Sequence, residues 1–395
     1  MKKYLLLLLL IIPINIYALE LNSKAYILYD ENTNKVILEH NSNEKRNIAS
    51  LTKMMSTIVA IENNPDLTKK VTITQEMLNT VPWDAAVIKL KAGDVLTMED
   101  LIYATLLPSG ADAVNSLAIA TAGDLPSFVK LMNDKAKELG MNNTSFENPI
   151  GMDHENNYST ASDLYILLKY VLHNNTFKKM FETKDYTMSN GMQVSATAKT
   201  FGDQINIDTS RIIGDKTGFT DPAEFCLAFE FVSHDHLFYA VLLGAPVENF
   251  TDFKHLRDAV SIINYLDNEF DYYTLVKNNT FYKDIKVVDS TIDNYSIYND
   301  KDLILLLNNY DQSKIRIEDN LPLEISYRNN KDEVLGTIKY YYEDDLIYER
   351  TVTLDEVIKP NLKNWIKIHI FELVVLVIIF ILLLIIITYW IKRKK

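Results

Sequence analysis

Cysteine is almost absent from the sequence: Cys226 is the only one among 395 residues. An internal disulfide is therefore excluded. Cys226 lies in the apolar run FCLAFEFV with no neighbouring cation, so we expect it to pack in a core rather than to react. The seven histidines show no spacing typical of a metal site. His234 and His236 in SHDH are expected in an exposed turn, with a metal site there as the less favoured alternative.

Positive charge is also scarce. The chain has 40 Lys and Arg residues against 53 Asp and Glu residues, a net charge of −13. Residues 1–18 and 365–395 hold seven of the basic residues and one of the acidic residues, so the rest of the chain carries a net charge of −19. A domain with this charge is not expected to bind nucleic acid. No internal repeat or low-complexity tract stands out, and the 48% of apolar residues suffices for a packed core.

The two ends of the chain hold its longest apolar runs. Residues 1–18 combine Lys2 and Lys3, a run of leucine and isoleucine, and the small residue Ala18 before polar sequence. This layout predicts a signal peptide, with an uncleaved anchor as the alternative. Residues 373–391 contain no charge, and a helix of that length spans about 28 Å, so we expect a transmembrane helix. The basic residues 392–395 are expected to form a cytoplasmic tail, with the bulk of the chain outside the cell membrane.

Between these ends, the hydrophobic spacing predicts an α+β fold. Residues 24–41 read as two strands around a polar turn, and a helix follows with Asn47 as its N-cap. Helical spacing continues over residues 98–140 and again from a cap at Ser159 or Thr160. Strand-like runs follow residue 208, and residues 250–270 are helical. We therefore predict, for residues 19–270, one antiparallel sheet flanked by helices, with the N-terminal hairpin beside the later strands. Short, turn-bounded runs predict a small all-β domain at 271–358, followed by a linker or stalk at 359–372.

The segment NIASLTKMM places Ser50 and Lys53 three residues apart near the start of the first predicted helix. Side chains at that spacing lie on one face of a helix, about one turn apart. A serine hydroxyl becomes a useful nucleophile when a base removes its proton, and a lysine amine at this distance can do so. The backbone N–H groups of the first turn are also free to donate. The spacing alone is weak, because it also occurs at Ser42–Lys45 and Ser127–Lys130.

Two further segments strengthen the catalytic interpretation. Ser109 lies in LLPSGADA, at a break between two apolar helical runs, where proline and glycine expose a side chain. GDKTGFTD holds Lys216, Thr217 and Gly218 at the start of a predicted strand. The glycine allows a substrate to approach the edge of that strand, and the lysine and threonine can hold a carboxylate.

Serine and lysine, a second serine and then K-T-G, in that order, form the motif set of the penicillin-recognising serine enzymes. The sequence resembles the D-alanyl-D-alanine carboxypeptidases, which are low-molecular-mass penicillin-binding proteins, over roughly residues 24–270. The β-rich part at 271–358 resembles the C-terminal domain of that family. The resemblance implies a fold like that of β-lactamases and transpeptidases, and a peptidoglycan stem pentapeptide as substrate. It also implies inhibition by β-lactam antibiotics and no need for a metal or an organic cofactor.

The resemblance also implies a role for each motif residue. Ser50 would attack the carbonyl of the penultimate D-alanine, and Lys53 would take its proton. Ser109 would relay a proton toward the leaving amine. The implied substrate-binding residues are Lys216, Thr217, Gly218 and Phe219. The lysine and threonine among them would hold the terminal carboxylate, and the N–H of Phe219 would complete an oxyanion hole with that of Ser50.

Three positions depart from the family pattern. Ala111 stands where the second motif usually has asparagine, and Asn115, one turn later, is a candidate replacement. Glu224 stands where a glycine is common after K-T-G, and we expect it to narrow or charge the groove. No arginine occurs near Thr251, where the family often has one for the carboxylate.

Three alternative functions follow from the same residues. A catalytically silent homologue that binds cell-wall peptide is one, and a D,D-endopeptidase that cuts crosslinks is another. A β-lactamase is less favoured, because the C-terminal anchor and the extra β-domain argue against it.

Overall fold

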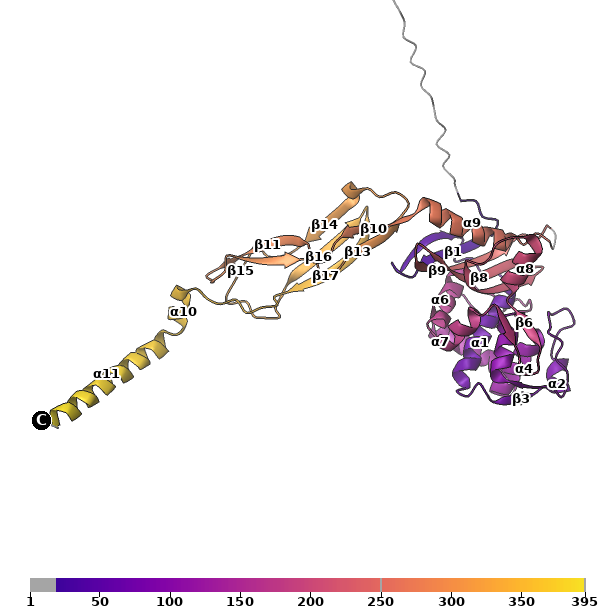
Figure 1. Cartoon of the computed structure of the whole chain (residues 1–395), viewed down its shortest axis with the longest axis horizontal. Helices are drawn as coiled ribbons and strands as arrows, with labels where there is room; N and C mark the ends of the chain where they lie inside the picture. The colour runs from indigo at the N-terminus through magenta and orange to yellow at the C-terminus, as the bar shows by residue number, and fades with distance from the viewer. Residues whose placement is uncertain (1–18, 249–250, 394–395) are drawn as a thin grey trace, which may run out of the picture. The chain divides into compact units, whose positions relative to one another are not determined.

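The computed structural model describes residues 19–248 and 251–393 and divides into two units, Met1–Phe270 and Asp271–Lys395 (Figure 1). The predicted signal peptide, residues 1–18, lies outside the described residues, as do Lys394 and Lys395 of the predicted tail. Each unit has a buried hydrophobic cluster of its own.

The N-terminal unit is built on an antiparallel five-stranded sheet in the order β2-β1-β9-β8-β7. Its first hairpin pairs with the later strands through β1 and β9, which confirms the predicted arrangement. The strand that carries K-T-G, β7, lies at the edge of this sheet, so one side of its backbone is open to a ligand. The strands are β1 (Ala25–Asp30), β2 (Lys35–His40), β7 (Ile212–Thr220), β8 (Glu224–Ser233) and β9 (His236–Ala245).

Helices cover both faces of the sheet (Figure 1). The last helix of the unit, α9, packs on β8 and β9, and α6 packs on β1 and β9 within the helical layer that surrounds α1. Alternate residues of β1, such as Ala25, Ile27 and Tyr29, join that layer in one buried cluster. The helices are α1 (Thr52–Asn63), α2 (Gln75–Asn79), α3 (Met98–Leu106), α4 (Ala111–Ala122), α5 (Leu125–Glu138), α6 (Ala161–Leu172), α7 (Asn175–Phe181), α8 (Thr197–Ile205) and α9 (Lys254–Glu269).

Several helices of this unit begin at a residue whose side chain caps the first turn. Thr160 caps α6, because its side chain accepts from the N–H of Asp163. The SHDH segment forms the turn between β8 and β9, as predicted. Cys226 is fully buried, as expected. Two short hairpins complete the unit, β3 (Lys70–Thr72) with β4 (Val95–Thr97) and β5 (Asp185–Thr187) with β6 (Gln193–Ser195).

The C-terminal unit consists of β-strands up to residue 353, apart from one short 3-10 turn, and helices form from residue 362 onward. Three small sheets share one buried cluster: β10 (Asp271–Val276) with β13 (Leu303–Leu307), β12 (Asn294–Tyr298) with β11 (Phe281–Val288) and β15 (Glu324–Ser326), and β14 (Ile315–Asp319) with β16 (Val334–Tyr342) and β17 (Asp345–Thr353). A short 3-10 turn, η2 (Gln312–Lys314), precedes β14. The predicted stalk contains a helix, α10 (Leu362–Ile368).

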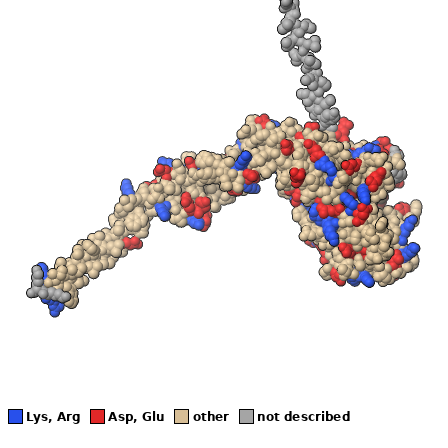
Figure 2. Space-filling model, in the orientation of Figure 1, with Lys and Arg blue, Asp and Glu red and all other residues tan. Residues whose placement is uncertain are grey.

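The last helix, α11 (Ile370–Arg393), has a mean hydropathy of 3.6 over its most apolar part. Among the described residues it is the one helix that is long and apolar enough to cross a membrane. Figure 2 shows few charged side chains along it, whereas both signs of charge are mixed over the visible face of the N-terminal unit. The fold class is therefore the predicted one: an antiparallel sheet flanked by helices, a small all-β domain and an apolar C-terminal helix.

Candidate active site

Ser50 lies in a 3-10 turn, η1 (Ala49–Leu51), directly before α1. The predicted capping role of Asn47 is wrong: α1 begins at Thr52, and the amide of Asn47 donates instead to the carboxylate of Asp153 at 2.8 Å. The 3-10 turn packs against β7. Ser50 is therefore presented between the start of α1 and the edge of the sheet.

Lys53 lies directly behind Ser50. Its Nζ is 2.7 Å from Ser50 Oγ and donates to the carbonyl of Ile150 at 2.7 Å. The side chain is 1% exposed. Burial and the nearby cation of Lys216 hold the pKa of Lys53 well below its usual value, and the carboxylate of Asp112 opposes them only in part. A buried amine with a lowered pKa is the form of lysine that can act as a base.

The carbonyl that accepts from Lys53 is placed by a close backbone contact. Gly151 follows Ile150 and has a φ of +91°, and a Cβ on it would lie 1.9 Å from the carbonyl oxygen of Ala49. Only glycine can occupy this position. Sequence reasoning missed Ile150, although the glycine in NPIGMD is the one local signal that a tight approach occurs there.

The K-T-G segment lies on β7 and uses both faces of that strand. On one face, a Cβ on Gly218 would lie 3.0 Å from the amide nitrogen of Ser50. Lys216, two residues earlier, is fully buried, and burial lowers its pKa to about 8 while the carboxylate of Asp215 works in the opposite direction. On the other face, the hydroxyl of Thr217 donates to that of Thr197 at 2.6 Å. The structure therefore brings the first and third motifs together.

The second motif lies at the start of α4. Ser109 is 6% exposed and has a φ of +66°, an unusual conformation for a residue other than glycine, and one that clusters at functional sites. Among the described residues, none forms a hydrogen bond with its Oγ. The hydroxyl is therefore buried, with its hydrogen-bonding capacity unused within the described part of the chain.

The residues after Ser109 hold a loop over the start of α4. The N–H of Ala111 donates to the carbonyl of Ala86 at 2.7 Å, and the carboxylate of Asp112 accepts from the N–H groups of Ile88 and Leu90. The side chain of Ala111 is fully buried in a small apolar cluster. Asp112 was not singled out from the sequence, because its partners are more than 20 residues away.

Asn115 does not replace the missing asparagine in this geometry. Its Nδ2 donates to the carbonyl of Thr80 at 3.2 Å and to its hydroxyl at 2.9 Å. The side chain is fully buried. Asn115 therefore holds the end of α2, and the donor that was expected to face the substrate is used there.

Glu224 does not charge the groove as expected. It follows the turn after β7 with a φ of +58°, and its Oε2 is 2.6 Å from Lys24 Nζ and 3.7 Å from Arg46 Nη2. The carboxylate is thus held by two cations. The ring of Phe219, which follows K-T-G, packs at a tilt against that of Phe225, with 5.1 Å between the centroids.

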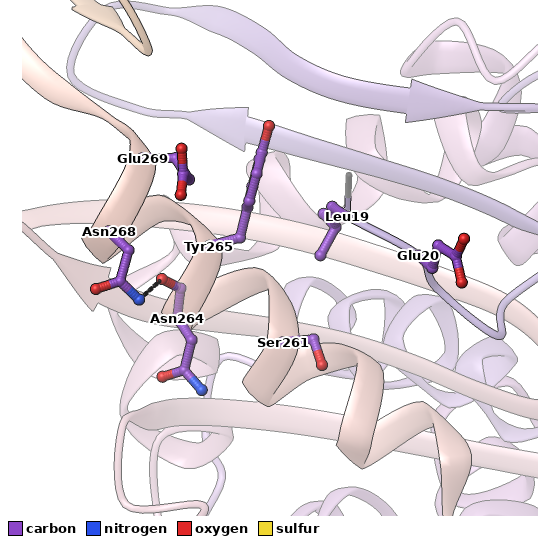
Figure 3. Close-up of a pocket in the computed structure, with 7 residues that line it drawn as sticks. All are labelled: Leu19, Glu20, Ser261, Asn264, Tyr265, Asn268 and Glu269. Atoms are coloured by element: carbon purple, nitrogen blue, oxygen red, sulfur yellow. Dashed lines mark hydrogen bonds between the residues drawn. The ribbon is translucent and has the colours of Figure 1, made fainter. Parts of the chain in front are cut away.

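Two of the pockets in the N-terminal unit differ in how close they lie to the motifs. One, of about 420 Å³, lies beside the second motif, and it is lined by Ile88, Pro108, Met192, Gln193, Val194, Ser195, Thr197 and Thr200. The other, of about 540 Å³, lies between α9 and the first described residues (Figure 3) and is lined by Leu19, Glu20, Ser261, Asn264, Tyr265, Asn268 and Glu269. Only the first contains residues next to the motifs, and it extends the site along β6 and α8.

The chain is similar to known proteins over both units. The D-alanyl-D-alanine carboxypeptidase family matches residues 14–247, and the C-terminal domain of penicillin-binding protein 5 matches residues 270–360. A D-alanyl-D-alanine carboxypeptidase of Bacillus subtilis is 27% identical over 350 residues, which cover 85% of this chain and 86% of that protein. Another, from Escherichia coli, is 32% identical over 235 residues, which cover 58% of each chain.

Solved structures agree with the fold. Penicillin-binding protein 5 from Haemophilus influenzae superimposes with a TM-score of 0.65 at 21% sequence identity. The superposition covers 86% of this chain and 98% of that one. The likeness therefore includes the β-rich C-terminal unit as well as the unit that carries the motifs.

Proposed function

The chain belongs to the D-alanyl-D-alanine carboxypeptidase family of serine peptidases, and from that premise we propose that Ser50 is the nucleophile that removes the terminal D-alanine from peptidoglycan stem pentapeptides. One observation carries the assignment of the nucleophile. The amine of Lys53 is 2.7 Å from Ser50 Oγ, fully buried, with its pKa lowered. A base within hydrogen-bond distance of a serine hydroxyl is what acyl transfer requires.

The proposed reaction begins with proton transfer from Ser50 Oγ to Lys53 Nζ as Oγ attacks the carbonyl carbon of the penultimate D-alanine. The resulting oxyanion would be stabilised by the N–H groups of Ser50 and Phe219. The close contact of Gly218 with Ser50 supports this pairing, because it brings the edge of β7 next to the nucleophile. Preorganised donors of this kind typically contribute about 10²–10³ in rate.

The acyl-enzyme forms when the peptide C–N bond breaks and the leaving amine gains a proton. We assign to Ser109 the relay of that proton from Lys53 to the leaving amine. The hydroxyl of Ser109 has no hydrogen-bond partner among the described residues. Water then attacks the ester, Ser50 regains its proton, and the shortened peptide leaves. A β-lactam would acylate Ser50 by the same first step.

The terminal carboxylate of the substrate would be held by Lys216 and Thr217. A buried cation next to an open strand edge is a strong site for an anion, since little water competes for it. The pKa of about 8 leaves Lys216 mostly charged at neutral pH. This supports its assignment as the carboxylate anchor rather than as a second base.

The apolar helix α11 favours attachment of the protein to a membrane. We propose that residues 1–18 direct export, that α11 spans the cell membrane and that residues 392–395 remain in the cytoplasm. The basic residues at that end support this orientation. The N-terminal unit would then meet peptidoglycan outside the membrane.

The test is D-alanine release from a stem pentapeptide by the detergent-solubilised full chain, beside Ser50→Ala and Lys53→Ala. We expect release by the wild type, none by Ser50→Ala and a loss of at least about 10³-fold for Lys53→Ala. Cleavage of a crosslinked dimer without release from the pentapeptide would instead favour the endopeptidase. Acylation by penicillin without either reaction would favour a silent binding homologue.

A further inference from the structure

Asp215 and Thr217 lie two residues apart on β7, and each contacts one of two neighbouring residues at the start of α8. The hydroxyl of Thr217 donates to Thr197 at 2.6 Å, and the carboxylate of Asp215 accepts from the N–H of Ala198 at 3.1 Å. Side chains at i and i+2 share one face of a strand. That face is opposite the one from which Gly218 approaches Ser50, so the contacts to α8 leave the approach of β7 to the nucleophile undisturbed.

The carboxylate of Asp215 is enclosed. Its side chain is 1% exposed, and its Oδ1 lies 3.8 Å from Lys184 Nζ. Lys184 also donates to the carbonyl of Ile212, at 2.7 Å, which ties it to the start of β7. Burying a carboxylate costs free energy unless opposite charges and hydrogen-bond donors compensate it. The position of Asp215 between K-T-G and α8 therefore carries a cost in stability.

α8 lacks a side-chain cap of its own. The residue at its N-cap is Ala196, and no side chain there accepts from the first turn. The N–H of Ala198 is one of the donors that a helix start leaves unsatisfied, and Asp215 accepts it from the neighbouring strand. A negative charge at this end of a helix is favourable. Asp215 therefore acts as a long-range cap that fixes the first turn of α8 against β7.

Fixing that turn also fixes a pair of hydroxyls. Each threonine hydroxyl has one proton to donate and two lone pairs. In the structure, Thr217 donates to Thr197. When Thr217 instead donates to a bound substrate carboxylate, the two threonines stay hydrogen-bonded to each other only if Thr197 turns its own proton toward Thr217 Oγ1. This arrangement keeps both hydroxyls hydrogen-bonded in either state.

We propose that Asp215 is a positioning residue for the carboxylate end of the substrate, holding Thr197 so that Thr197 supports Thr217 as the donor to that carboxylate. The inference rests on the proposed function of the K-T-G segment and extends it to α8. The charge of Asp215 has a second effect in the same direction: it opposes the burial that lowers the pKa of Lys216. Both effects strengthen the binding of an anion.

The test compares acylation of the full chain by a penicillin and by its methyl ester, which lacks the carboxylate charge. The measured quantity is the ratio of the two second-order rate constants. We expect Asp215→Ala to lower this ratio about tenfold, with little change in the rate for the ester. Asp215→Asn keeps an acceptor for Ala198 and should lower the ratio by only about threefold. With the pentapeptide, KM should rise more than kcat falls.

Two further variants separate positioning from folding. Thr197→Val leaves Asp215 in place and should lower the ratio as Asp215→Ala does, with no further loss in the double variant. Asp163→Ala removes another buried carboxylate, one that accepts from Asn143 and Thr144 away from the motifs. It should lower the melting temperature and leave the ratio unchanged.

Several results would overturn the inference. They are an unchanged ratio in Asp215→Ala and Thr197→Val, a parallel loss with both reagents, or a lowered ratio in Asp163→Ala. A wild type that neither reagent acylates would overturn the proposed function itself, and the inference with it. If the wild type is acylated faster by penicillin than by its ester, and the variants show the same ratio, the proposed function stands and only the role of Asp215 is refuted.

Discussion

Gly218 and Ser50 are in direct backbone contact: a Cβ on Gly218 would lie 3.0 Å from the amide nitrogen of Ser50. The same Cβ would lie 3.1 Å from the carbonyl oxygen of Ile48 and 3.1 Å from the Cβ of Ala49. Two of these three neighbours are backbone atoms, which cannot move aside as a flexible side chain can. The glycine of K-T-G is therefore the residue that lets the edge strand reach Ser50, the proposed nucleophile.

Gly218→Ala should push β7 away from η1. Preorganised donors lose their effect when they shift by a fraction of an ångström, so we expect acylation by penicillin to slow by about 10- to 100-fold. The melting temperature should fall by only a few degrees, because the change lies at a sheet edge. Stopped-flow acylation and thermal denaturation measure the two effects. An alanine variant that is acylated at the wild-type rate would contradict the close contact.

In the proposed mechanism, Lys53 must be neutral to accept the proton of Ser50. As the pH falls through the pKa of Lys53, the base becomes protonated and kcat/KM falls. Because the cation of Lys216 helps to lower that pKa, Lys216→Met should raise it. The acid limb of the pH profile of acylation should then move to higher pH, even if the maximal rate of the variant is lower. Lys199→Met, which removes a half-exposed lysine paired with Asp185, should leave the limb in place. Identical limbs in all three proteins would refute the coupling.

Lys216 should give opposite pH trends in activity and in stability. Its pKa is lowered to about 8 in the folded protein from 10.5. If Lys216 holds the substrate carboxylate as proposed, substrate binding should weaken as the pH rises through 8 and the lysine loses its charge. The unfolded chain holds more protons than the folded chain between about pH 8 and 10.5, so the contribution of Lys216 to stability rises there. Relative to Lys216→Met, the free energy of unfolding should increase by about 3 kcal/mol across this window.

Urea denaturation of both proteins at pH 7.5 and pH 10.5 measures this difference, and the pH profile of KM measures the loss of binding. A stability difference that stays constant between the two pH values would mean that the pKa of Lys216 is not lowered by burial. A KM that does not change through pH 8 would mean that the charge of Lys216 does not hold the substrate carboxylate.

The sequence revealed the parts of the site that depend on short spacings. Ser50 and Lys53 lie within one turn, and Lys216, Thr217 and Gly218 follow one another on a strand. The hairpin, the antiparallel sheet and the cap at Thr160 were likewise predictable, because periodicity and capping residues are local signals.

What the sequence did not reveal depends on contacts between distant segments. Asp112 and Asp215 each hold backbone groups of another element, and no spacing indicates such partners. The 3-10 turn at Ser50 is set by contacts of Ala49 with Gly151 and β7, which is why Asn47 was wrongly expected to cap the helix. Glu224 was wrongly expected to charge the groove, because its ion pairs with Lys24 and Arg46 join segments that are distant in the sequence.

Glu224→Gln should leave catalysis unchanged. The carboxylate is held by Lys24 and Arg46 at partly exposed positions, where ion pairs typically contribute less than about 1 kcal/mol. We expect a small loss of stability that salt reduces, and a kcat/KM for the pentapeptide within about twofold of the wild type. Denaturation at two salt concentrations, beside steady-state kinetics, checks both parts. A fivefold change in kcat/KM would mean that the charge of Glu224 acts on the substrate-binding groove after all.

Ala111→Asn should not improve the enzyme, although asparagine is the usual residue there in the family. Ala111 is fully buried with Val114 and Ile150, and Val81, Ala85 and Met152 pack against them. An asparagine amide in this cluster would have several unsatisfied hydrogen-bonding groups, at a cost of about 1–3 kcal/mol. It would also push against the loop that Ala86 and Asp112 hold.

We therefore expect Ala111→Asn to lower the melting temperature and to leave kcat/KM for the pentapeptide unchanged or reduced. Ala111→Ser, with a smaller polar group, should lie between the two proteins in stability. Calorimetry and D-alanine release measure the two quantities on the same preparations. A gain in kcat/KM would show that the side chain at position 111 reaches the substrate, and that alanine there costs the enzyme a contact. An unchanged or lower rate of D-alanine release would mean that the side chain at position 111 packs against the loop at 80–90 and does not contact the substrate.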